Sequence, residues 1–273
     1  MDLRPYLKTP KLVAMASQVL SYQPFILTDD IQTGVAYSWL HHEDGGRRCY
    51  AQSEFVFDRN FCSQEVWGRA NDANQRLRNM YETWLDTLAS LLPGASVAEV
   101  GCNTGYFLVG AQRRGMGPCT GVDEGDYGPT LKFLNEVLGT HVRFRQAAYD
   151  SWKHTVSGLE PHDIVIASAV IQHISDPLYL LSFLGSIARK ALFLFTGMGD
   201  SDDYLVYYSS PNKFYRDKPF PVCFDNDVCL SRGLLMKSLE MLGFRRIIEI
   251  PWQSDWLPLE WKGSQKALVC LRE

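Results

Sequence analysis

The chain has 273 residues, of which 46% are hydrophobic and 21% charged, enough apolar material for one large core or for a core with a smaller cap. No apolar run reaches the length of a membrane span, and the first residues lack the apolar segment of a signal peptide. Seven cysteines without a close CxxC pair disfavour zinc and a disulfide framework. We therefore expect a cytoplasmic protein without a metal site.

The net charge of −4 argues against a protein that holds nucleic acid mainly through its phosphates, because such proteins carry a basic surplus. Arginine pairs occur at 47–48, 113–114 and 245–246, but paired charges of this kind are usually solvated surface. We expect neither a nucleic-acid partner nor a membrane partner.

From about Leu77 the chain alternates between apolar patterns of helix and strand type. Apolar residues at helical spacing from Leu77 predict a helix that ends at Pro93 and Gly94. Later helices are expected after the glycine loop at 101–105, at 128–139, from Asp176–Pro177 and from Ser231. Seven short apolar runs predict strands, at Val97–Val100, Cys119–Asp123, Val142–Arg145, Asp163–Ala169, Ala191–Phe195, Phe244–Ile250 and Lys266–Leu271.

Strands that alternate with helices pair in parallel, with helices on both faces of the sheet. The last two strands have no full helix between them and are expected to pair as an antiparallel hairpin. The sequence therefore predicts an α/β fold: a doubly wound, mostly parallel, seven-stranded sheet with an antiparallel C-terminal hairpin.

Two stretches interrupt this alternation. Residues 1–70 show no sustained period but many aromatic residues, and the segment 196–230 is long and rich in tyrosine. Loops of that length are usually lids or binding segments, and their aromatic content argues against disorder. We expect residues 1–70 to form an aromatic-rich N-terminal cap, and residues 71–273 to form the ligand-binding domain with a substrate-side insertion at 196–230.

The residues best suited to bind a ligand follow the first two of these strands. Gly101 and Gly105 bracket the turn that follows the strand, and Asp123 ends the next strand. In open α/β sheets, ligands bind beyond the carboxyl ends of the strands, where an acid can accept hydrogen bonds from both ribose hydroxyls. The dinucleotide fingerprint GxGxxG would need glycine at 103 and 106, where the chain has Asn103 and Tyr106.

The spacing Glu99-x-Gly101-x-x-x-Gly105 resembles motif I of the class I, Rossmann-like methyltransferases that use S-adenosylmethionine (SAM). The resemblance covers about Leu77 to the C-terminus. It implies that Glu99 helps hold the loop and the methionine part of SAM, and that Asp123 holds the ribose. The loop backbone at 101–105, including Cys102 and Asn103, would line the cofactor.

The same resemblance concerns the residues that follow the loop and the fourth strand. The run from Ile164 to Pro177 is similar to the family's apolar strand, histidine turn and Asp-Pro pair, and it implies that backbone near Ser168 lies close to the methionine amine. Tyr106 either contributes a cation–π contact to the sulfonium or packs beside the cofactor.

A narrower similarity links Phe25–Gly34, Ala148–Asp150 and the tyrosine-rich insertion to the branch that contains the tRNA wobble-uridine carboxymethyl transferases. This similarity implies that Tyr149 and Asp150 lie near the adenine. Alternatively, Asp150 caps the turn Ser151–Lys153.

A phenol or alcohol acceptor needs a general base, and histidine suits neutral pH. His173 follows the fourth strand at the expected edge, so it is either this base or a residue that only shapes the turn. His41, His42 and Glu43 resemble metal ligands, but without a further ligand cluster we interpret them as a solvated loop.

These features predict a SAM-dependent methyltransferase that modifies a small organic acceptor on oxygen or nitrogen, in biosynthesis or secondary metabolism. One alternative is a tRNA wobble-uridine transferase that uses SAM or carboxy-SAM. Another is a non-catalytic scaffold with the same fold, because fold alone does not fix function. The sequence identifies neither the acceptor nor the oligomeric state.

Overall fold

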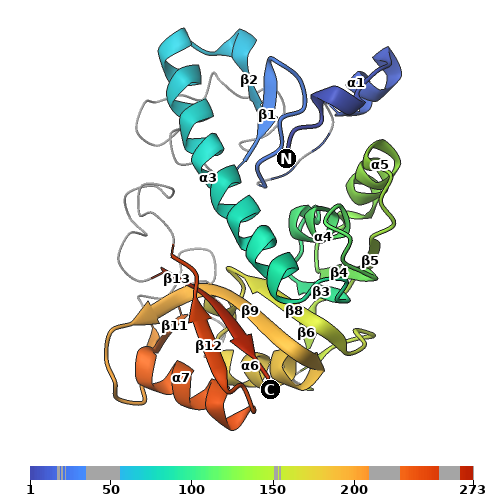
Figure 1. Ribbon diagram of the computed structural model, residues 1–273. Coiled ribbons are helices and arrows are strands. Elements are labelled where there is room, and N and C mark those ends of the chain that lie inside the picture. Colours follow the sequence, from blue (N-terminus) through green and yellow to red (C-terminus); the bar gives the residue numbers. More distant parts are fainter. Residues whose placement is uncertain are drawn as a thin grey trace.

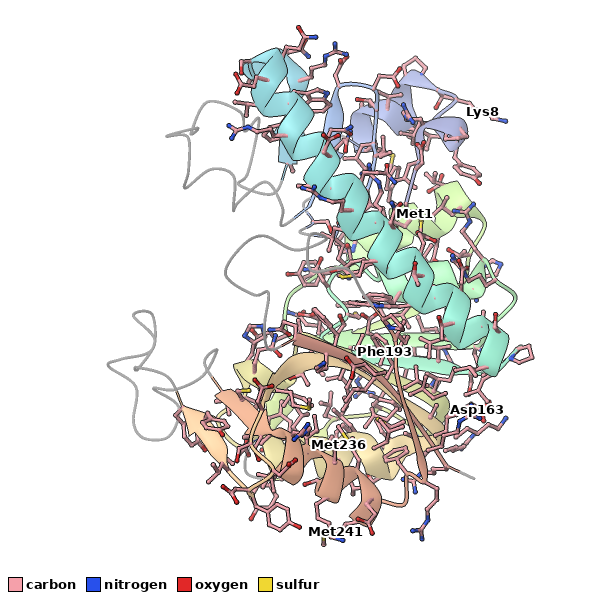
Figure 2. All side chains as sticks on the ribbon, turned by 60° about the vertical axis from the view of Figure 1, so that its left-hand side comes forward. Met1, Lys8, Asp163, Phe193, Met236 and Met241 are labelled. Carbon is pink, nitrogen blue, oxygen red and sulfur yellow. The ribbon has the colours of Figure 1, made fainter. Side chains whose placement is uncertain are left out.

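The computed structural model describes residues 1–16, 19, 21, 23–34, 56–150, 153, 155–208, 228–251 and 265–272. The described elements are arranged around one central sheet. Helices α3 (Gln64–Leu91) and α4 (Tyr106–Gln112) pack on one face, and α6 (Pro177–Ile187) and α7 (Arg232–Met241) pack on the other (Figure 1). In Figure 2, Phe193 marks the sheet below α3, and Met236 of α7 lies on its far side. The predicted doubly wound arrangement is confirmed.

The core of the sheet has the strand order β5, β4, β3, β8, β9, β13, β12. Its first five strands are parallel, and β13 is antiparallel to both of its neighbours. Their bounds are β3 Val97–Val100, β4 Cys119–Asp123, β5 Arg143–Gln146, β8 His162–Ser168, β9 Ala188–Gly199, β12 Arg246–Glu249 and β13 Gln265–Leu271. The chain reverses its direction of travel across the sheet between β3 and β8, and ligands bind at such a switch point.

Alternate side chains of the buried strands enter two separate cores. Along β9, Phe193 and Phe195 join α3 and α4, whereas Leu192 and Leu194 join α6 and α7. Both faces are covered because the apolar runs of β8 and β9 carry apolar side chains on both sides, and these must be buried on both faces of the sheet.

Two further strands extend the sheet beyond the seven that the sequence predicts. β11 (Val228–Ser231) pairs in parallel with the end of β9, and β10 (Val206–Tyr208) pairs with β11, giving nine strands in all among the described residues. Strand β9 continues to Gly199 because β13 and β11 pair with it there. Both ends of the predicted insertion at 196–230 therefore belong to strands, and residues 209–227 lie outside the described residues.

The predicted helix starting near Leu77 is the second half of a longer one. α3 begins at Gln64, where the Ser63 hydroxyl accepts a hydrogen bond from Val66 N at 3.2 Å. Apolar periodicity becomes regular only from Leu77, because the first half of α3 lies beyond the sheet and is largely polar. The predicted boundary between residues 70 and 71 falls inside this continuous helix.

The described part of the first 34 residues packs on the same core as α3 and α4, whereas Phe57 packs with Ala70 and Trp67 in a separate cluster. Phe25 and Leu27 are fully buried in that core, and the Phe25 and Tyr106 rings are 5.2 Å apart. The elements here are η1 (Arg4–Tyr6), α1 (Pro10–Ala16), η2 (Arg59–Phe61) and the antiparallel pair β1 (Ile31–Thr33) and β2 (Val56–Asp58). The cap remains a proposal, since residues 35–55, with His41, His42 and Glu43, lie outside the described residues.

The remaining elements are α5 (Gly128–Leu138), η3 (Ile171–His173) and the short pair β6 (Tyr149–Asp150) and β7 (Thr155–Val156). The predicted glycine stop of α5 is confirmed, because Gly139 has a φ of 65° in the left-handed region. α6 begins at Pro177 as predicted, but the Asp176 side chain makes no capping hydrogen bond.

Candidate functional site

The loop between β3 and α4 has the tight shape that its glycines allow. Gly101, Asn103 and Gly105 have φ values of 69°, 48° and 79°, all in the left-handed region. A Cβ added to Gly101 would lie 2.6 Å from Val170 Cγ2, and one added to Gly105 would lie 2.9 Å from Leu131 Cδ1. The loop therefore presents its backbone with no room for side chains at either glycine.

Asp123 joins this loop to the end of β4. Its Oδ2 accepts a hydrogen bond from Asn103 N at 2.8 Å, and its Oδ1 accepts one from Gly125 N at 2.9 Å. A carboxylate offers about four acceptor positions, so two remain for a ligand such as a ribose diol. The acid and the glycine loop, 20 residues apart in sequence, are brought together as the sequence predicts.

Glu99 lies below the loop, inside β3. It is 1% exposed, and its Oε2 has no hydrogen-bond partner among the described residues. Burial raises the pKa of Glu99 well above the usual 4.5, and the nearby Asp123 carboxylate adds to this rise. A buried acceptor without a partner is costly, so this oxygen fits a ligand that brings a donor or a positive charge.

Replacing Glu99 with glutamine should stabilise the ligand-free protein and weaken its hold on SAM. The folded protein keeps the Glu99 proton more tightly than the unfolded chain does, so this group costs wild-type stability increasingly as pH rises above 4.5. We expect Glu99→Gln to melt higher than wild type by about 2–4 °C at pH 8, roughly the effect of 1 kcal/mol, and to melt alike near pH 4. SAM affinity should fall at least about tenfold.

Thermal melts of the ligand-free proteins at both pH values, with calorimetric titration of SAM, check this expectation. Glu136→Gln on the exposed face of α5 is the matched control and should change neither quantity. Equal melting temperatures of wild type and Glu99→Gln at pH 8 would show that burial of the charge is not costly here.

The turn after β8 lies against the glycine loop. Ser168 ends β8, Ala169 has a φ of 57°, and Val170 packs beside Gly101. Ala169 N donates to Phe195 O at 2.7 Å, which holds this unusual backbone against β9. The end of β8 thus lies beside β3, the strand that leads into the loop, and contact of the Ser168 backbone with the methionine amine stays a prediction. His173 lies exposed on η3 after the turn. A role of His173 as a base stays a prediction.

Tyr106 points into the core. Its side chain is fully buried, its hydroxyl donates to Glu82 Oε1 and accepts from Met1 N, and its ring contacts Phe25, Tyr81 and Phe107. No ring face is left for a sulfonium, so the contacts support packing rather than a cation–π role. Cys102 is also buried, and this burial raises the pKa of its thiol, which stays protonated at neutral pH.

Tyr149 and Asp150 make local contacts. The Tyr149 hydroxyl donates to Asp176 Oδ2 at 3.2 Å, and burial followed by the Asp176 charge raises the pKa of Tyr149. Asp150 Oδ1 accepts a hydrogen bond from Lys153 N at 3.1 Å, the contact expected if Asp150 caps the turn, although residues 151 and 152 lie outside the described residues. Contact of either residue with an adenine stays a prediction.

Two residues that contact the loop were missed by the sequence reasoning. Ser21 Oγ lies 2.7 Å from Thr104 Oγ1, and Gln23 is hydrogen-bonded to three groups of the loop. Neither belongs to a motif or a periodic pattern, and both precede the loop by about 80 residues. The sequence contains no local signal that could have identified them.

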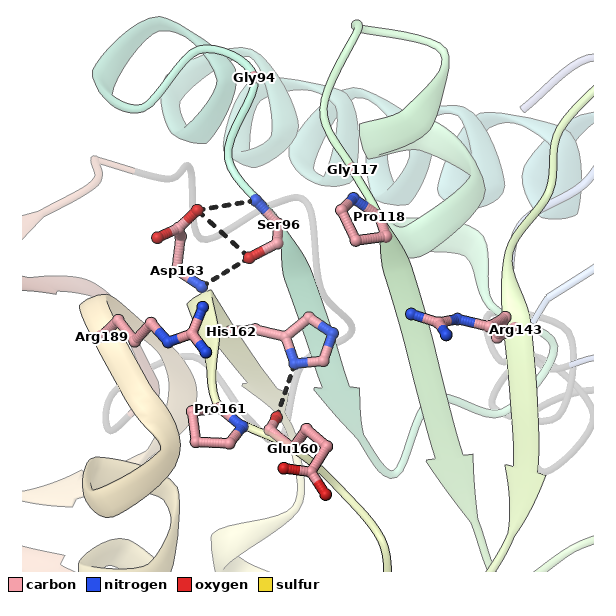
Figure 3. A pocket seen from close by; sticks show the side chains of 10 residues that line it. All are labelled: Gly94, Ser96, Gly117, Pro118, Arg143, Glu160, Pro161, His162, Asp163 and Arg189. Carbon is pink, nitrogen blue, oxygen red and sulfur yellow. Dashed lines mark hydrogen bonds between the residues drawn. The ribbon is translucent and has the colours of Figure 1, made fainter.

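A surface depression of about 380 Å³ lies at the other edge of the sheet. Figure 3 shows it at the amino ends of the strands, where Asp163 Oδ2 accepts hydrogen bonds from Ser96 and where Arg143 and Arg189 lie on either side of His162. Parallel sheets bind their ligands at the carboxyl ends. The glycine loop, rather than this depression, is therefore the candidate site.

These features define a class: Rossmann-like α/β enzymes that bind an adenosine-containing cofactor on the loop after the first sheet strand. Residues 74–216 match the sequence profile of a methyltransferase domain family, and the chain belongs to this family. It is a SAM-dependent methyltransferase, and SAM is its cofactor. No curated protein matches the chain.

Two solved structures that were obtained with SAH share the fold at low sequence identity. The N-terminal domain of EvdMO1, crystallised in the presence of SAH and D-fucose, is 19% identical, with a TM-score of 0.55 over 71% of this chain and 83% of that one. Magnesium protoporphyrin IX methyltransferase from Synechocystis with bound SAH is 17% identical, with a TM-score of 0.52 over 85% and 94%. Among the described residues, no helix combines the length and apolar character needed to cross a membrane.

Proposed function

We propose that the protein transfers the methyl group of SAM to a small organic acceptor, on oxygen or nitrogen, at the carboxyl edge of β3, β4 and β8. The observation that carries the proposal is the buried Glu99 Oε2, which has no described partner and lies below a loop tied to Asp123. Glu99, whose Oε2 has no described partner, and Asp123, which has spare acceptor positions, lie on either side of the loop backbone at 101–105. This arrangement suits a ligand with a cationic amino-acid part and a ribose.

SAM would supply the reactive methyl group, and the chain's own residues would bind and orient it. In this proposal Glu99 and the backbone at Ser168 serve the methionine part, Asp123 accepts from the ribose, and the backbone of 101–105 gives close approach. His173 would accept the acceptor's proton if the acceptor is a phenol or alcohol.

Residues 1–70 and the insertion at 196–230 would enclose the acceptor and exclude water. Supporting this, the Tyr208 hydroxyl of β10 donates to Ser175 O at 3.0 Å, which holds the described part of the insertion beside the turn after β8. Of the two solved structures named above, one was crystallised in the presence of D-fucose and the other is a methyltransferase named for magnesium protoporphyrin IX, and both compounds are small molecules. A small acceptor is the class that these features favour.

Methyl transfer to small molecules is tested by incubating the protein with SAM carrying a labelled methyl group and a panel of sugars, phenols and amines. Labelled product together with SAH formation supports the proposal. A protein that binds SAM tightly but methylates nothing in the panel, and that retains tRNA, would favour the tRNA alternative. A protein that does not bind SAM would be a scaffold.

We expect no tight, salt-sensitive binding of tRNA at micromolar protein. The insertion carries three basic residues, Lys213, Arg216 and Lys218, against six acids, Asp200, Asp202, Asp203, Asp217, Asp225 and Asp227. Acidic charge beside the site repels a polyanion. A tRNA enzyme that neutralised six to ten phosphates would lose roughly 10³- to 10⁵-fold in affinity between 50 and 200 mM salt. Filter binding across this salt range checks the expectation, and steep salt-dependent retention would contradict it.

A further inference from the structure

Gln23 reaches the glycine loop from the other end of the chain. Its side chain is 4% exposed overall and makes three hydrogen bonds to the loop. The amide Nε2 donates to Cys102 O at 3.2 Å, and Oε1 accepts from Thr104 Oγ1 at 2.8 Å and from Tyr106 N at 3.0 Å. One side chain thus spans the loop from Cys102 to Tyr106.

Of these three groups, Tyr106 N depends most on Gln23, because Cys102 O also accepts from Gly105 N at 2.8 Å and Thr104 Oγ1 also lies 2.7 Å from Ser21 Oγ. Tyr106 N belongs to the first turn of α4, where backbone amides have no partner within the helix. The N-cap residue Gly105 has no side chain to supply one. Gln23 therefore does the work of a helix cap from 83 residues away, in a place too buried for bulk water to replace it.

Gln23 is itself held in place by its neighbours. Its backbone N donates to Ser21 Oγ at 2.9 Å, and its carbonyl accepts from Thr33 Oγ1 at 2.7 Å. Thr33 O in turn accepts from Asn74 Nδ2 of α3 at 3.0 Å. A continuous set of hydrogen bonds runs from α3 through β1 and Gln23 to the loop, so the side chain has little freedom to leave it.

The loop that Gln23 holds also sets the position of the acid at the end of β4. Gln23 contacts the carbonyl of Cys102 and the hydroxyl of Thr104, and Asn103 lies between these two residues. Asn103 N donates a hydrogen bond to Asp123 Oδ2. A shift of the segment 102–104 would move this amide and change the orientation of the carboxylate. We propose that Gln23 is a positioning residue for SAM, one that fixes the loop in its cofactor-binding shape, and this rests on the proposed cofactor site.

The test compares three variants by calorimetric titration of SAM and SAH. Gln23→Ala removes all three hydrogen bonds and leaves the buried Tyr106 N without its partner, so the affinity for both ligands should fall roughly ten- to hundredfold. Gln23→Glu keeps the two accepting contacts but sets a carboxylate against Cys102 O, so it should fall between wild type and Gln23→Ala. The control Arg4→Ala removes exposed ion pairs to Asp2 and Asp29 in the same N-terminal segment and should leave both affinities unchanged.

Two further readings separate positioning from general loss of stability. Titrations are run well below the melting temperature of each ligand-free variant, and hydrogen exchange at Tyr106 N is expected to be faster in Gln23→Ala than in Arg4→Ala. Lower melting temperature with unchanged affinity in Gln23→Ala and Gln23→Glu would overturn the inference and leave the cofactor site intact. If wild type itself bound neither SAM nor SAH, the proposed site would fail, and the inference with it.

Discussion

Replacing Gly101 with valine is expected to abolish SAM binding, with a loss of at least about a hundredfold, or roughly 2.7 kcal/mol. Gly101 has a φ of 69°, which costs an L-residue about 1–2 kcal/mol and a β-branched one more. A Cβ there would lie 2.6 Å from Val170 Cγ2, so the loop or the turn after β8 must move. The loop and this turn together form the proposed cofactor site. Calorimetric titration of SAM into folded Gly101→Val measures the loss of affinity.

Gly94 provides the matched control for backbone strain. It has a φ of 71°, no atom lies within 4 Å of the position a Cβ would take, and it stands at the amino edge of the sheet. Gly94→Val should therefore introduce a backbone strain comparable to that of Gly101→Val and lower the melting temperature, but it should bind SAM normally. Normal binding by Gly101→Val would remove the assignment of this loop, whereas equal loss in both variants would point to strain alone.

Asp123→Ala is the second change with a large expected effect. The carboxylate is proposed to accept from the ribose, and a hydrogen bond to a charged group contributes about 1.5–3 kcal/mol, so SAM affinity should fall roughly ten- to 150-fold. The variant also frees Asn103 N and Gly125 N, which now donate to this carboxylate. Calorimetry measures the SAM affinity, and a thermal melt of the ligand-free variant measures the stability lost when these two amides lose their acceptor.

Asp163 is the control that separates the loss of SAM affinity from the loss of stability. Its Oδ2 accepts from Ser96 N at 3.1 Å and Ser96 Oγ at 3.2 Å, in an arrangement like that of Asp123 but at the opposite edge of the sheet. We expect Asp163→Ala to lose stability and to keep its SAM affinity. An Asp123→Ala protein that melts lower yet binds SAM as wild type does would limit Asp123 to a structural role.

The sequence by itself determined the sheet and the place of the site. The runs Val97–Val100 and Cys119–Asp123 lie fully or largely buried in the sheet, and short, mostly apolar runs with glycine or proline close by, in alternation with helical patterns, indicate buried parallel strands. Gly101 and Gly105 fixed the loop because the left-handed region excludes most other residues. These features depend on neighbours in sequence, so periodicity and residue type were sufficient to predict them.

Only the tertiary structure decided which side chains complete the site. Tyr106 follows the loop directly, yet its ring is buried with Phe25 and Tyr81, because the first turn of α4 faces α3 and the N-terminal segment. Gln23 contacts the loop although no local pattern marks it. The difference has one physical reason: a helix, a strand or a tight turn follows from local backbone preferences and burial, whereas a hydrogen bond between residues 80 positions apart exists only once both segments are packed on a common core.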